Sequence, residues 1–82
     1  MKTEYTQDHL TALARLYRDK EAEYRKLDAM AEEYLSAGNF VRRDNAKEDA
    51  GNIWQMMKGI EVAAEALGIP KEVLRKAAKE GA

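Results

Sequence analysis

Thr6 and Ser36 bound a stretch of the chain that contains neither glycine nor proline. The stretch is rich in Ala, Leu, Glu, Lys, Arg and Tyr, which tolerate or favour helices, and it lacks the two residues that interrupt them. It therefore predicts one long helix over residues 6–36. Either Thr3 or Thr6 is expected to cap the first turn, because a threonine hydroxyl can accept a hydrogen bond from a free backbone N–H.

Two breaks divide the rest of the chain into two further helices. Gly38 can end the first helix in the left-handed conformation and Asn39 can cap the next, which predicts a second helix over residues 40–67. Gly68 and Pro70 then predict a stop and a short third helix over residues 70–79. The fold class is all-α, in a single domain of residues 1–82.

Apolar residues in both long helices recur at alternating spacings of three and four, which is typical of helices packed at a shallow angle. If the chain folds back at the Gly38–Asn39 junction, residues whose numbers sum to 77 face each other and the two apolar seams coincide. The same register brings Asp28 near Lys47. These patterns predict an antiparallel helical hairpin about 40 Å long. The paired seam positions are Ala31 with Ala46, Leu27 with Ala50, Tyr24 with Ile53, Lys20 with Met57, Tyr17 with Ile60, Leu13 with Ala64 and Leu10 with Leu67.

A lone hairpin leaves apolar residues outside its seam on both flanks. Leu16, Met30, Met56 and Ala63 line up on one flank, and Leu35 and Trp54 fall on the other. The short third helix is expected to cover only the open end of the hairpin, near Leu10, Leu13 and Leu16. The middle could be buried within the monomer by the third helix or a bend at Gly51, by a partner, or by a second hairpin that completes a four-helix bundle.

We predict a partner-binding surface around the uncovered methionines and tryptophan, which are effective anchors for a protein partner. Arg42 and Arg43 lie in the first turn of the second helix, where free N–H groups also favour an anion or an acidic partner. The alternative for these two arginines is pairing with nearby carboxylates. The predicted partner-binding residues are Leu16, Met30, Trp54, Met56, Arg42 and Arg43.

Enzymatic chemistry is not expected. The chain has no cysteine, one histidine (His9) and one serine (Ser36), and its glycines form no phosphate-binding loop, so no catalytic residue, metal site, cofactor or small-molecule substrate is predicted. The net charge is −1 and the mean hydropathy is −0.68. No segment is apolar enough to span a membrane and the N-terminus does not resemble a signal peptide, so we expect a cytoplasmic protein.

Residues 60–79, IEVAAEALGIPKEVLRKAAK, resemble a helix-turn-helix DNA-binding unit. The resemblance rests on that unit's small, turn-glycine and buried positions: Ala64, Gly68, Ile69, Leu74 and Ala77. It implies that the last helix would enter the major groove. The side chains presented to DNA would then be Lys71, Glu72, Arg75, Lys76 and Lys79.

Two functions are therefore predicted. The first is a non-catalytic helical interaction module, an adaptor or an inhibitor of a larger protein, which also self-associates. The second is a DNA-binding regulator that dimerises through the long hairpin and reads DNA with its last helix.

Overall fold

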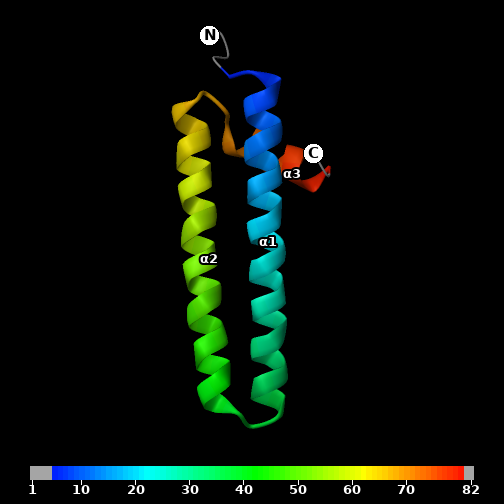
Figure 1. Ribbon diagram of the computed structural model, residues 1–82, viewed down its shortest axis with the longest axis vertical. Coiled ribbons are helices and arrows are strands. Elements are labelled where there is room, and N and C mark those ends of the chain that lie inside the picture. Colours follow the sequence, from blue (N-terminus) through cyan, green and yellow to red (C-terminus); the bar gives the residue numbers. More distant parts are fainter. Residues whose placement is uncertain (1–4, 81–82) are drawn as a thin grey trace.

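The computed structural model describes residues 5–80 and consists of three helices, α1 (Gln7–Ser36), α2 (Phe40–Ala66) and α3 (Lys71–Lys79). The two long helices run antiparallel side by side, and α3 lies near the end where the hairpin opens (Figure 1). No strand occurs within residues 5–80. The all-α prediction is confirmed, and each predicted helix boundary lies within one residue of the observed one.

Side-chain caps set the starts of both long helices. The Thr6 side chain accepts a hydrogen bond from the backbone N–H of His9 at 3.2 Å, and the Asn39 side chain accepts one from Arg42 at 3.3 Å. Each satisfies a backbone donor that has no partner inside the helix. Thr6 is thus the cap of α1, and the alternative candidate, Thr3, lies outside the described residues.

Both long helices end in the same glycine-dependent turn. Gly38 and Gly68 have φ angles of 75° and 86°, in the left-handed region that side-chain-bearing residues avoid. After each glycine, the next N–H donates back into the last helical turn, from Asn39 to Tyr34 and from Ile69 to Ala64, at 2.8 Å in both cases. In these turns, carbonyl groups of the last helical turn that would otherwise lack a partner accept backbone hydrogen bonds.

The predicted register of the hairpin is confirmed. Lys47 Nζ lies 3.2 Å from Asp28 Oδ1, and Ala31, Ala46 and Ala50 are buried between the helices. Small residues therefore fill the seam near the turn, which lets the two helices lie close together. The molecule is correspondingly elongated, with extents of 53 × 21 × 15 Å.

The larger part of the core lies at the open end, where α3 joins the hairpin. Its buried members are Leu10, Ala14, Tyr17, Met57, Ile60, Ala64, Ile69, Leu74 and Ala78. Ile69 and Leu74 are completely buried although one precedes α3 and the other lies within it. The turn before α3 and α3 itself thus supply the two largest fully buried side chains, which secure α3 to the hairpin by apolar burial.

Two details of the sequence interpretation are wrong at this end. Leu67 caps α2 and is 40% exposed, so it does not continue the seam opposite Leu10. Leu16 is 45% exposed, so the third helix does not cover it. The physical reason for the second error is that α3 packs against the side of α1 that carries Ala14 and Tyr17, and Leu16 projects to the opposite side.

We expect Gly38→Ala to lower the free energy of unfolding by about 1–2 kcal/mol, because alanine resists the left-handed conformation. Gly51→Ala is the matched control. Gly51 is exposed within α2 and an added Cβ would meet nothing within 4 Å, so this change should instead stabilise the protein by about 1 kcal/mol. Urea unfolding followed by circular dichroism measures the change in the free energy of unfolding for both variants. Equal changes of the same sign would contradict the left-handed role assigned to Gly38.

Candidate interaction site on the two flanks of the hairpin

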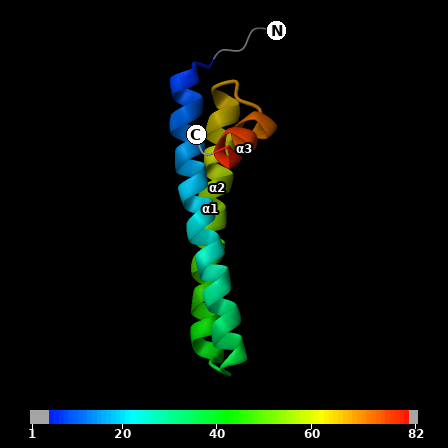
Figure 2. The same cartoon turned by 90° about the vertical axis from the view of Figure 1, so that its right-hand side faces the viewer.

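The hairpin has two long flanks, and α3 lies on only one of them. Figure 2 views the hairpin edge-on and shows α3 to one side of the two long helices, near their upper end. We call this side the covered flank, which carries Tyr17, Trp54 and Glu61. The opposite side is the open flank, which carries Leu16, Met30 and Met56. The predicted separation of Trp54 from the other three apolar residues matches this geometry.

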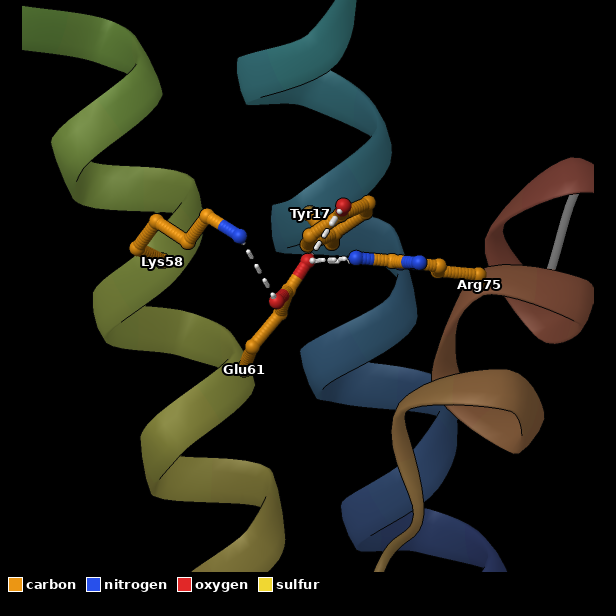
Figure 3. A network of polar contacts seen from close by, with 4 residues as sticks. All are labelled: Tyr17, Lys58, Glu61 and Arg75. Carbon is orange, nitrogen blue, oxygen red and sulfur yellow. Dashed lines mark hydrogen bonds and ion pairs between the residues drawn. The ribbon is translucent and has the colours of Figure 1, made fainter.

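A buried carboxylate joins all three helices on the covered flank (Figure 3). Glu61 of α2 is 3% exposed. Its Oε2 atom accepts a hydrogen bond from the Tyr17 hydroxyl of α1 at 2.8 Å and another from Arg75 Nη2 of α3 at 3.0 Å. Lys58 Nζ lies 3.8 Å from the other oxygen, Oε1, which has no hydrogen bond of its own.

The pKa values of the cluster follow from this arrangement. Burial alone would raise the pKa of Glu61, but the hydrogen bonds from Tyr17 and Arg75 and the charges of Arg75 and Lys58 together lower it below its ordinary value. Burial raises the pKa of the Tyr17 phenol, and its hydrogen bond to Glu61 raises it further. The cluster is therefore held with an ionised glutamate and a neutral tyrosine.

Beyond α3, the covered flank continues as a small groove. Its lining includes Tyr24, Trp54 and the ion-paired Asp28 and Lys47. Lys58 Nζ lies 4.8 Å from the centroid of the Trp54 ring, so the same ammonium group contacts the indole and approaches Glu61. Trp54 remains 43% exposed, but one face of its ring is already occupied within the chain.

The open flank carries a longer groove that none of the three described helices covers. A cavity of about 530 Å³ runs between the two helices in the middle of the hairpin. A second one, about 150 Å³, extends it toward the turn and shares Leu27, Met30 and Asp49 with it. The other lining residues of the two cavities are Glu23, Lys26, Tyr34, Arg42, Asn45, Ala46, Asn52 and Ile53.

Toward the open end, the open flank becomes more apolar. Leu16 lies seven residues before Glu23 and Met56 lies three after Ile53, so both continue the lines of the groove. They are 45% and 49% exposed. Gly59 and Ala63 follow on the same side of α2, and a Cβ added at Gly59 would meet nothing within 4 Å. The flank thus has a polar-edged groove in the middle and a smooth apolar end.

The predicted partner-binding residues are divided between these surfaces. Leu16, Met30, Met56 and Arg42 belong to the open flank, whereas Trp54 belongs to the covered one. Arg43 lies 2.8 Å from Asp44 and its guanidinium is 5.6 Å from the Phe40 ring centroid, so its side chain is held locally. The structure therefore places four of the six on one flank, with Leu16 and Met56 toward the open end and Met30 and Arg42 toward the turn.

The residues of the DNA-binding interpretation lie on α3. Lys71, Lys76 and Lys79 are exposed. Arg75 is 53% exposed in its side chain, and its guanidinium is engaged with Glu61. That ion pair leaves α3 with three basic side chains on its outer surface that make no ion pair within the described part of the chain.

Sequence reasoning did not identify Glu61 as a structural centre. The sequence did indicate that Tyr17 and Glu61 lie close together, because their residue numbers sum to 78, within one residue of the predicted register. Arg75 carried no comparable signal, since its position depends on how α3 folds back.

Within residues 5–80, no group of histidine, cysteine, aspartate and glutamate side chains is arranged to hold a metal ion. None of the described helices is long and apolar enough to cross a membrane. In comparisons with known proteins, no family model, curated protein or solved structure matched the chain.

The Glu61 cluster predicts a specific dependence of stability on pH. A glutamate with a lowered pKa in the folded state stabilises the protein above its unfolded pKa, near 4.5, and loses that effect as the pH falls toward the folded value. A tyrosine with a raised pKa stabilises below 10.0 and loses that effect as the pH rises further. The free energy of unfolding, measured with urea over a range of pH, should therefore decline at both acidic and strongly basic pH.

Tyr17→Phe tests this assignment, because it removes the phenol donor and leaves a buried carboxylate oxygen with one partner fewer. We expect a loss of about 1–3 kcal/mol at neutral pH. The decline in the free energy of unfolding at acidic pH should also become smaller, because the Tyr17 hydrogen bond is one of the causes that lower the pKa of Glu61. Tyr34→Phe is the control, since Tyr34 makes no side-chain hydrogen bond within the described residues. Identical pH profiles for wild type and Tyr17→Phe would rule out the proposed role of Glu61.

Proposed function

We propose that this protein is a non-catalytic helical module that binds a protein partner through the open flank. The observation that carries the proposal is the asymmetry of the hairpin: within residues 5–80, α3 covers part of one flank and no helix covers the other (Figure 2). Exposed apolar side chains on that bare side, Leu16 and Met56, are the type of residue that anchors interfaces.

The open flank also has the physical character of a recognition surface. Its central groove combines an apolar floor, which includes Leu27, Met30 and Ile53, with the charged side chains of Glu23, Lys26 and Asp49. Apolar burial supplies affinity, and charges at the rim select orientation and partner. An elongated helix pair of this kind presents a surface best matched by other helices.

Photo-crosslinking compares the two flanks directly. We expect p-benzoylphenylalanine at Met56, on the open flank, to give discrete crosslinked protein species in the native host. The same group at Trp54 is the matched control, because that position has a similar exposure of 43% and lies on the covered flank. Equal yields from both positions, or no product from Met56, would contradict the proposal.

DNA binding is the second candidate, and the exposed Lys71, Lys76 and Lys79 of α3 support it. Against it stands Arg75, whose guanidinium is already engaged by Glu61. If α3 contacts DNA, affinity for a labelled duplex should fall steeply with added salt, because phosphate contacts release counterions. Lys76→Ala combined with Lys79→Ala should weaken binding at every sequence. No retention of duplex at low salt would exclude this function.

A further inference from the structure

We infer that the partner on the open flank is a second copy of this chain, with the two hairpins related by a twofold axis parallel to their length. In this arrangement α1 of each copy lies against α2 of the other, both turns lie at the same end, and α3 stays on the outside. The product is a four-helix bundle in which every neighbouring pair of helices is antiparallel. This inference rests on the proposed function of the open flank and specifies its occupant.

The exposed area of the chain fits this occupant. The solvent-accessible surface is 5860 Å². A compact monomer of 9.3 kDa exposes about 5,000 Å² by the usual scaling of area with mass, so this chain exposes about 900 Å² more. A stable protein interface buries about 800 Å² on each partner. Loss of one flank to an equally long hairpin would remove an area of that size.

Gly59 supplies a second, independent argument. A glycine inside a helix costs about 1 kcal/mol relative to alanine, and nothing in the monomer requires one at this position. With the axis parallel to the hairpin, the register that sums to 77 also describes residues facing each other between copies. Leu16 of one copy then falls between Gly59 and Ala63 of its partner. A large exposed side chain thus meets a gap between small ones, as facing layers of a bundle require.

The charges of the open flank are complementary in the same register. Lys26 of one copy lies within two residues of direct opposition to Asp49 of the other, and Glu33 lies at the same offset from Arg42. The Asp28–Lys47 ion pair inside the chain has this offset as well, and the symmetry repeats both pairs. No ion pair involves any of these four side chains within residues 5–80. Each can therefore pair across the interface without breaking a contact inside the chain.

The opposite orientation, with the axis across the hairpin, fits less well. It would set α2 of one copy against α2 of the other, with the turns at opposite ends. With the two α2 helices fully overlapped, residue numbers sum to about 106, so Asp49 would lie against Met56 of the other copy and lose water without gaining a partner, which is unfavourable for a carboxylate. The axis parallel to the hairpin instead joins the apolar ends of both copies.

Two glycine substitutions test the interface. Gly59→Gln places a long polar side chain on the open flank, and Gly51→Gln places the same side chain on the covered flank at a glycine that is also exposed. Both replace glycine with a good helix former, so both variants should fold. We expect sedimentation equilibrium to give twice the 9.3 kDa monomer mass for wild type and Gly51→Gln.

For Gly59→Gln we expect the dimer dissociation constant to rise at least about tenfold. A wild-type chain that is monomeric at all accessible concentrations, or equal dissociation constants for the two variants, would overturn the inference. The proposed function is tested separately: a monomeric chain that still crosslinks to another protein from Met56 would leave the proposed function standing and replace only its occupant.

The orientation has its own measurement. Because the chain contains no cysteine, Ala37→Cys gives one nitroxide label at the turn of each copy. With both turns at one end, the spin–spin distance should be well under half of the 53 Å length of the molecule. A distance close to the full length would show the opposite orientation and overturn the arrangement proposed here.

Discussion

The carboxylate of Glu61 determines how the three helices are assembled. Glu61 belongs to α2, and its carboxylate accepts hydrogen bonds from the Tyr17 hydroxyl of α1 and the Arg75 guanidinium of α3. Each helix therefore contributes to one buried polar centre. Burying this charge is costly, and its partners offset that cost only when α3 lies on the same side as Tyr17. The cluster therefore favours the arrangement in which α3 covers this flank, and that arrangement leaves the opposite flank available to a partner.

The sequence was sufficient for the helices and for the hairpin register, because both depend on local signals. Capping residues, left-handed glycines and heptad spacing operate over a few residues, and the Asp28–Lys47 contact follows once the turn is placed. The side on which α3 docks was not predictable in this way. It depends on Arg75 meeting Glu61, a pair separated by a turn of irregular backbone, and on burial of Leu74. Because the docking side of α3 was not predictable, the expectation that α3 covers Leu16 was wrong.

The four glycines within residues 5–80 divide into two physical kinds. Gly38 and Gly68 adopt backbone conformations that other residues resist, so the monomer fold accounts for them completely. Gly51 and Gly59 are helical and face open space, so the monomer gives no reason for either. Gly51 borders the covered-flank groove beside Trp54, whereas Gly59 lies on the bare apolar end of the open flank. Only the second is set opposite a large exposed side chain by the symmetry proposed here.

The small size of the chain makes burial of the open flank important for stability. A domain of this length buries only about 60% of the surface of its unfolded chain, so its stability margin is small. α3 adds stability to one end of the hairpin through Ile69 and Leu74, but the half near the turn is held mainly by a seam of alanines. Association through the open flank would bury the groove over that weaker half. Because binding to the folded state alone stabilises a protein by mass action, folding and assembly would then be coupled, and the turn end would gain the most.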